Sequence, residues 1–306
     1  THYKSGTACP QELVDFETVL KKDLAKAGNE KRFAKDKKFW DDQLDTLGEP
    51  LYSDIQGPSV LEEARKRHGD PKLRASDIEM NELFVAVKDY HLEPYATQNL
   101  MDFCMNHQLS MTNLLLLGIR TYLSKVNNGQ EDITIQNFIS RRSTHDEWTS
   151  GGSRTIMFPC RTVISPETDF LSAAYEIQNM QNRIYMHSNY DPALIVDEMR
   201  KRYHTPEHTS YESCYLTYQP MPVKVENEML GTVRQHAKWF ANGAATKKMY
   251  LTVSHTEDGG MNFSYHYQTA HLEEHDMELL YYYMMRILFK GIAEPDMSIG
   301  EIMEQV

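Results

Sequence analysis

The chain has 306 residues, with 32 Lys and Arg against 44 Asp and Glu, and its formal net charge is −12 at pH 7. This acidic balance argues against general nucleic-acid binding, which needs a positive surface to displace counterions. The 18 Tyr, 17 Met and 11 Phe exclude a disordered chain. No apolar run approaches the roughly 18 residues of a membrane span, so we expect one large or two smaller folded domains and no membrane partner.

Cysteine spacing and the N-terminal sequence bear on the cellular compartment. Cys9, Cys104, Cys160 and Cys214 are scattered, with no CxxC spacing. In a chain of this size, that pattern predicts free thiols in a reducing compartment rather than a disulfide framework. No apolar segment typical of a signal peptide follows Thr1, so we expect a cytoplasmic protein. The first residue is Thr rather than Met, which favours a fragment.

The first part of the chain is predicted to be helical. Apolar residues recur at helical spacing over 13–24, after Pro10, and this predicts a first helix. A second helix is predicted over 33–47, where Phe39 and Trp40 belong to the apolar face and are expected in the core.

The rest of the chain alternates between predicted helices and strands. A connection is predicted over 51–75. Strands are predicted over 82–87, 132–139, 155–164, 211–218, 249–254 and 261–267, and helices over 94–107, 111–127, 170–186, 191–203 and 277–289. Asp258, Gly259 and Gly260 between the last two strands indicate a hairpin. The alternation predicts an α/β or mixed α+β class.

Common catalytic motifs are absent or incomplete. His271 and His275 fit the HxxEH pattern of zinc peptidases, but no downstream carboxylate motif completes three ligands, so we expect the polar start of the last helix instead. Pro206 separates His204 from His208 and disfavours a shared helical face. The sequence also lacks GxGxxG, Walker A and GxSxG motifs. Residue chemistry alone therefore gives no complete catalytic set.

An ordered series of segments is more informative. Its members are residues 14–16, 35–40, 110–116, 132–135, 140–143, 152–161, 185–190 and 217–220. In that order they resemble the condensation domain of nonribosomal peptide synthetases, with its Y-x-D-F, D-I-hydrophobic, G-x-x-x-N-T-x-x-x-R and H-Q-D-Y-P segments. The resemblance spans nearly the whole chain, and the order is more specific than any one motif.

The resemblance implies a fold and a function. The fold would be an α/β (α+β) sandwich like that of chloramphenicol acetyltransferase, with a mixed sheet flanked by helices. Residues 1–75 would be the final helices and connection of an N-terminal lobe, and 76–306 the C-terminal lobe. The family joins aminoacyl or acyl thioesters, held on the phosphopantetheine of peptidyl or acyl carrier proteins, by an amide bond. Adenylation domains would be neighbours, and no metal or directly bound cofactor is implied.

The departures from the family concern its active site. The HHxxxDG motif is absent, since no two histidines are adjacent, and the chain is therefore expected to hold no catalytic residue and to be inactive alone. Ile156 and Met157 replace the family's Asn and Thr, and with His187 they are candidates for the tunnel wall or floor. Arg142, with Arg141 beside it, matches the arginine that pairs with the motif's aspartate and supports the active site; the alternative is that both are loop arginines in solvent.

Several interpretations stay open. A stand-alone acyltransferase that uses an alcohol or a CoA substrate is one alternative function, and a non-catalytic docking platform for carrier proteins is another. An intact HHxxxDG upstream of Thr1 would favour catalysis. The basic run over 21–38 is either a solvated helix face or a surface that steers an acidic carrier protein. Arg161 is expected to cap or flank its strand.

Overall fold

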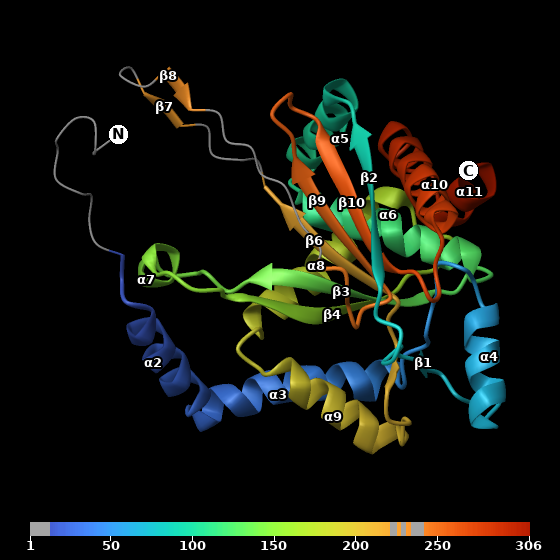
Figure 1. Ribbon diagram of the computed structural model, residues 1–306, viewed down its shortest axis with the longest axis horizontal. Helices are drawn as coiled ribbons and strands as arrows, with labels where there is room; N and C mark the ends of the chain where they lie inside the picture. The colour runs from blue at the N-terminus through green and yellow to red at the C-terminus, as the bar shows by residue number, and fades with distance from the viewer. Residues whose placement is uncertain (1–12, 221–224, 228–230, 234–241) are drawn as a thin grey trace.

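A computed structural model describes residues 13–220, 225–227, 231–233 and 242–306 (Figure 1). Two helices lead the chain, α2 (Phe16–Ala27) and α3 (Glu30–Leu47). The Asp15 side chain caps α2 by accepting a hydrogen bond from the backbone amide of Thr18. The helix predicted over 33–47 is confirmed. The helix predicted over 13–24 is found as α2, which begins at Phe16, directly after its cap Asp15. Pro10 lies outside the described residues.

The remaining elements follow in chain order. The helices are α4 (Ser59–His68), α5 (Pro94–Asn106), α6 (Met111–Val126), α7 (His145–Thr149), α8 (Phe170–Met186), α9 (Pro192–Tyr203), α10 (Glu274–Ala293) and α11 (Ile299–Gln305). The strands are β1 (Ser76–Asp77), β2 (Val85–Leu92), β3 (Asp132–Ser140), β4 (Thr155–Val163), β5 (Thr209–Ser210), β6 (Cys214–Gln219), β7 (Val225–Asn227), β8 (Gly231–Val233), β9 (Met249–His255) and β10 (Met261–Gln268).

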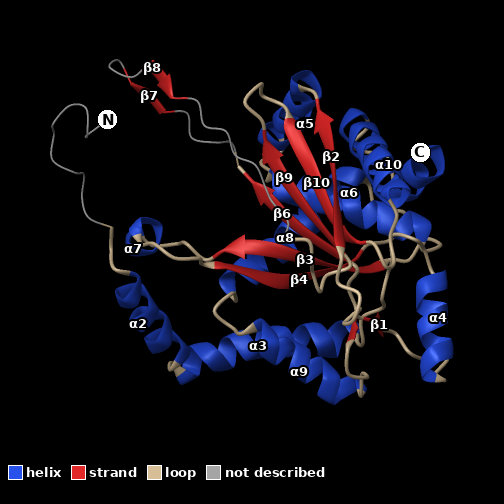
Figure 2. Cartoon of the chain, in the orientation of Figure 1, coloured by secondary structure: helices blue, strands red, loops and turns tan. Residues whose placement is uncertain are grey.

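A six-stranded sheet forms the centre, in the order β2-β10-β9-β6-β3-β4. Strand β6 runs parallel to both β3 and β9, and the other neighbours are antiparallel, so the sheet is mixed. The predicted hairpin between β9 and β10 is confirmed. Figure 2 shows helices α6, α8 and α10 beside this sheet. The predicted mixed class of helices and strands is confirmed.

Helix α6 is the centre of the hydrophobic core. Every residue from Met111 to Ser124 except Thr112 is buried, as expected for a helix covered on all sides. Gly118 lets α10 approach closely, because a Cβ there would lie 3.0 Å from side-chain atoms of Met284 and Leu288. Phe39 and Trp40 are buried as expected, with Trp40 stacked on Phe158 of β4.

Some predicted boundaries were wrong. The expected connection over 51–75 contains α4, which buries only Leu61 and Ala64 and so has no recognisable apolar stripe. The strand predicted from residue 82 begins at Val85, and Phe84, which is 77% exposed, makes only an isolated bridge with Ala244. Helix α10 extends beyond the predicted 277–289 at both ends. Helices α7 and α11 and strands β1, β5, β7 and β8 were not predicted.

Three cysteines lie inside the fold. Cys104, Cys160 and Cys214 are buried free thiols, and burial raises the pKa of each to about 12. Cys9 lies outside the described residues. Among the described helices, none is long and apolar enough to cross a bilayer.

Candidate functional site

Arg141 and Arg142 open the link between β3 and β4, residues 141–154, which contains α7 and which we call the β3–β4 connection. The Arg142 guanidinium donates hydrogen bonds to three backbone carbonyls of this connection, those of Glu147, Ser150 (3.1 Å) and Gly152 (2.7 Å). Arg142 is therefore a clamp on the connection rather than a loop arginine in solvent. Its ion pair with the aspartate of HHxxxDG stays a prediction.

Four charged side chains join α2 to the β3–β4 connection, and we call them the ionic ring: Asp23, Lys26, Glu147 and Arg154. Arg154 forms a fork on Asp23, with N–O distances of 2.6 and 3.2 Å, and lies 3.3 Å from Glu147. Lys26 closes the ring at 2.9 Å from Glu147 and 3.8 Å from Asp23. The side chains of Arg154 and Glu147 are each only 5% exposed, so this is a largely desolvated network.

Arg141 extends the ionic ring to α8. It lies 3.5 Å from Asp23 and donates a 3.2 Å hydrogen bond to the carbonyl of Ser188, just beyond the end of α8. Of the two arginines singled out in the sequence, one therefore clamps the connection and the other ties it to neighbouring elements. Arg154, which carries more of the charge pairing, was not singled out.

Glu147 is held ionised by its surroundings. Burial alone raises its pKa, but hydrogen bonds from the Ser143 amide and hydroxyl, from Lys26 and from the Thr144 amide outweigh burial and lower the pKa from 4.5 to about 2. Glu147 is also the third residue of α7 and completes a capping box with Thr144. The carboxylate therefore supports both α7 and the ionic ring.

The low pKa of Glu147 gives a pH prediction. A carboxyl whose pKa falls on folding contributes stability that is complete above pH 4.5 and is lost as the pH falls through about 2. We expect Glu147→Gln to cost about 3 kcal/mol at pH 7 and progressively less towards pH 2. Urea unfolding at several pH values measures the difference, and a pH-independent difference would contradict the assignment.

Ile156 and Met157 are the second and third residues of β4 and point to opposite faces of the sheet. Ile156 pairs with Ile139 and packs against the buried core. Met157 pairs with Phe138, whose ring contacts Tyr250 edge-on at 5.2 Å. Since directly opposite residues on antiparallel strands share a face, only Met157 lies on the face away from the core.

That face carries a group of half-buried polar and aromatic side chains, which we call the open face: Phe138, Met157, Thr217, Tyr250 and His266. The hydroxyls of Thr217 and Tyr250 are 2.6 Å apart, and the rings of Tyr250 and His266 meet at 6.4 Å. These residues come from five strands, and only Met157 was expected here. Half-burial of aromatic and hydroxyl groups suits the wall of a binding channel.

His187 lies elsewhere, at the end of α8. Its Nδ1 lies 2.8 Å from the buried Asp36 carboxylate, and its ring stacks on Phe39 at 4.3 Å. Both contacts are to α3, so His187 ties α8 to α3. Its predicted place at the tunnel floor stays a prediction.

Arg161 caps a helix rather than its own strand. It forms a fork on Asp132, at 2.8 and 2.7 Å, and donates to the carbonyls of Leu47, Gly48 and Glu49 at the end of α3. These carbonyls lack partners within the helix. Arg161 was expected to cap or flank its strand, whereas its guanidinium contacts the end of α3.

The four paired histidines of the sequence have different surroundings in the structure. His271 precedes α10 and lies 3.1 Å from Glu79, whereas His275 lies within α10 and contacts Glu278. His204 and His208 both have positive φ, at 53° and 60°, in the loop after α9. Within the described part of the chain, no group of three or more His, Cys, Asp or Glu could hold a metal ion.

Comparison with known proteins decides the family. The family model described as "Condensation domain" matches residues 2–304. The chain belongs to the condensation domain family. The fold expected from the resemblance, a mixed sheet flanked by helices as in chloramphenicol acetyltransferase, is thereby confirmed, since solved condensation domains share it.

Relatives of this condensation-family chain are distant in sequence. A plipastatin synthase from Bacillus subtilis (strain 168) is 21% identical over 273 residues, which are 89% of this chain and 10% of that protein. The first condensation domain of the calcium-dependent antibiotic synthetase superposes with a TM-score of 0.73 at 15% identity, covering 98% of this chain and 60% of that one. VibH, a nonribosomal peptide synthetase condensation enzyme, has a TM-score of 0.68 at 12% identity, covering 99% and 64%.

Proposed function

We propose that this condensation-family chain forms part of an enzyme that joins two carrier-bound substrates by an amide bond. The donor is an acyl or aminoacyl thioester and the acceptor an amine, both held on the phosphopantetheine of carrier proteins beside adenylation domains. The match of the family model along residues 2–304 carries this proposal. The names of the relatives, which are synthases of plipastatin and surfactin, support it.

The open face is proposed as a wall of the substrate tunnel. Met157 and Phe138 give it apolar surface, while the hydroxyls of Thr217 and Tyr250 provide polar groups that orient a substrate. The β3–β4 connection leads directly into β4 and Met157, so the Arg142 clamp and the ionic ring would hold this wall in place. Orientation of two reactants is itself a large part of such catalysis.

The base for the reaction is proposed to come from an HHxxxDG segment that these 306 residues do not contain. The open face offers two titratable side chains, and neither is a good substitute. Burial lowers the pKa of His266, which makes the imidazole a weaker base. Burial raises the pKa of Tyr250, so its hydroxyl stays protonated near neutral pH. We therefore expect the chain alone to give no condensation product.

The test is a condensation assay with two loaded carrier proteins. The chain alone is compared with a longer protein that also carries an HHxxxDG lobe, and the amide product is measured by mass spectrometry. We expect product only from the longer protein. Product from the chain alone would overturn the proposed source of the base, and no product from either would favour the docking-platform alternative.

A further inference from the structure

A small, mostly apolar cavity lies between helices α3, α8 and α9 and strands β3 and β4. Its volume is about 40 Å³, which exceeds the roughly 10–15 Å³ that one water molecule needs. Figure 1 shows α3 and α9 side by side below the two strands. The apolar lining residues are Trp40, Leu44, Pro50, Pro159, Met180, Ile195 and Met199, and the polar ones are Gln43, Thr134, Arg161 and Glu212.

Two buried polar groups of this lining have no hydrogen-bond partner among the described residues. They are the indole N–H of Trp40 on α3 and the hydroxyl of Thr134 on β3. Trp40 is 5% exposed and Thr134 is 2% exposed. Buried polar groups in folded proteins nearly always have a partner, and a group without one costs stability. Because both residues line the same cavity, one ligand in it can serve both groups.

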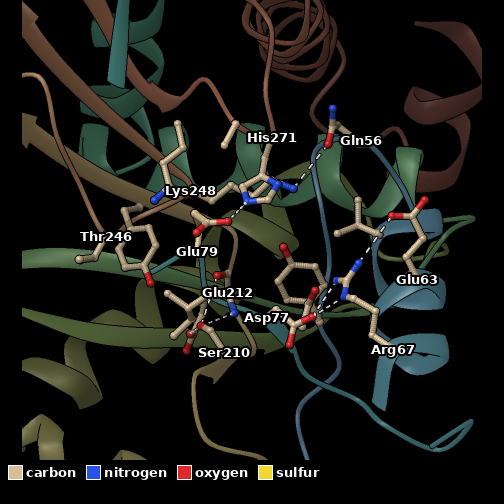
Figure 3. A pocket seen from close by; sticks show the side chains of 17 residues that line it. Gln56, Glu63, Arg67, Asp77, Glu79, Ser210, Glu212, Thr246, Lys248 and His271 are labelled. Atoms are coloured by element: carbon tan, nitrogen blue, oxygen red, sulfur yellow. Dashed lines mark hydrogen bonds and ion pairs between the residues drawn. The ribbon is translucent and has the colours of Figure 1, made fainter. Parts of the chain in front are cut away.

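The charged residues of the lining have partners elsewhere. Arg161 forms its fork on Asp132, and Glu212 accepts hydrogen bonds from Gln136 at 3.0 Å and from Ser210 at 2.6 Å. Figure 3 shows Ser210 and Glu212 together at the edge of a larger polar cavity, which Glu212 also lines. The lining of the smaller cavity therefore holds one positive and one negative charge, both engaged, and does not select an ion.

We propose that this cavity holds an ordered water molecule that bridges α3 and β3, accepting a hydrogen bond from the Trp40 indole and sharing another with the Thr134 hydroxyl. A hydrocarbon would leave both groups without a partner. A cation cannot pair with the indole N–H, which only donates, and an anion would lie in a largely apolar lining whose one cation is already paired. A neutral molecule that both accepts and donates fits, and a volume of about 40 Å³ suits water.

The water joins two parts of the chain that the family resemblance assigns to different lobes, α3 to the N-terminal lobe and β3 to the C-terminal lobe. It adds to two contacts already described between α3 and the sheet, the stacking of Trp40 on Phe158 and the contacts of Arg161 with the end of α3. Trp40 is then a hydrogen-bond donor as well as a core residue. The site is additional to the proposed condensation chemistry and requires no step of it.

Nuclear magnetic resonance of the isotope-labelled chain tests for the water directly. We expect a rotating-frame Overhauser peak between water and the indole N–H of Trp40, with the sign of a bound water rather than that of proton exchange. Trp40→Phe assigns the peak by removing it. Trp148, which is 68% exposed, is the comparison within the same spectrum, because its side chain meets bulk solvent. The lack of a bound-water peak at Trp40 would overturn the proposal.

Removal of the Thr134 hydroxyl tests the bridge independently. Thr134→Val keeps the shape of the side chain but leaves the water and the Trp40 N–H with one partner fewer, so we expect the unfolding constant from urea titration to rise about tenfold. The matched control is Thr121→Val on α6. Thr121 is also buried with an unpartnered hydroxyl, but it is not part of the cavity lining. Its substitution should leave the unfolding constant unchanged or lower it.

Equal effects of Thr134→Val and Thr121→Val would overturn the proposal, because they would show that the Thr134 hydroxyl has no ligand to lose. The water peak at Trp40 should persist in Thr134→Ser, which keeps a hydroxyl, and weaken in Thr134→Val. A peak that is unchanged in Thr134→Val would contradict a shared bridge. If Thr134→Val fails to fold, the wild-type and Thr134→Ser spectra decide. None of these readouts depends on condensation activity.

Discussion

Arg154→Met should destabilise the chain by about 3 kcal/mol, because it removes the buried arginine that pairs with both acids of the ionic ring, Asp23 and Glu147, and leaves Lys26 as the cation they share. Methionine fills much of the arginine volume, so the loss reports charge pairing more than packing. Urea unfolding followed by circular dichroism measures it. Hydrogen exchange should also rise in α2, since the ring is a principal tie between α2 and the β3–β4 connection.

A matched control lies on the same helix. Lys21→Met removes an exposed pair with Glu17, in which both side chains are more than 60% exposed, and should cost less than about 0.5 kcal/mol. The double variant of Asp23→Asn with Arg154→Met should lose less than the sum of the two single losses. Equal costs for Lys21→Met and Arg154→Met would show that the ring contributes no more than a surface pair.

Arg142→Ala should lower condensation about a hundredfold in a protein that also carries the HHxxxDG lobe. The variant loses three hydrogen bonds to backbone carbonyls of the β3–β4 connection and, as the family resemblance predicts, the partner of the motif's aspartate. Turnover with loaded carrier proteins measures the loss of condensation activity. The melting temperature reports the loss of stability in the β3–β4 connection.

Arg142→Lys separates these two roles. Lysine keeps the charge but lacks the planar fork that reaches several carbonyls. If the ion pair dominates, Lys should restore much of the turnover lost in Arg142→Ala; if the clamp dominates, both variants should be similarly slow and similarly destabilised. Wild-type turnover together with a wild-type melting temperature in Arg142→Ala would refute both roles.

The basic run over 21–38 is expected to have a smaller effect, on the binding of a carrier protein. Several of its lysines already have acidic partners: Lys22 pairs with Asp146, Lys37 with Asp41 and Lys38 with Asp42. The run also divides between two helices, α2 and α3. Steering of a carrier protein by this segment stays a prediction, and the pairing of its charges reduces the field it can present.

The elements predicted best are those with a cap and a buried face. Helix α8 spans the predicted residues, because Asp169 caps its start and Ala174 and Ile177 lie on a continuous buried side. Helix α4 was missed because a helix that buries only two side chains leaves no period in the sequence. The periodicity of apolar residues reflects which side chains are buried, so it does not reveal elements that bury few side chains.

The site was harder to predict for a different reason. Arg142 is held by backbone carbonyls, which every residue possesses, so no residue type marks its partners. Asp23 and Arg154 are 131 residues apart in the chain, and one acid among 44 cannot be matched to one base by sequence alone. The strand predicted over 155–164 is found as β4, but that Ile156 and Met157 point to opposite faces depended on strand register, and the tunnel role of both stays a prediction.

The order of strands in the central sheet also determines when the sheet can form during translation. Strand β2 is the first long strand along the described residues, yet its only partner in the described sheet is β10, the last strand of that sheet along the chain. During translation β2 must therefore wait until residue 268 has left the ribosome, with its hydrogen-bonding groups open to other chains. Assembly is dominated by distant contacts and should be slow. A break in synthesis before β10 would leave two open strand edges, on β2 and β9, and a molecule prone to aggregate.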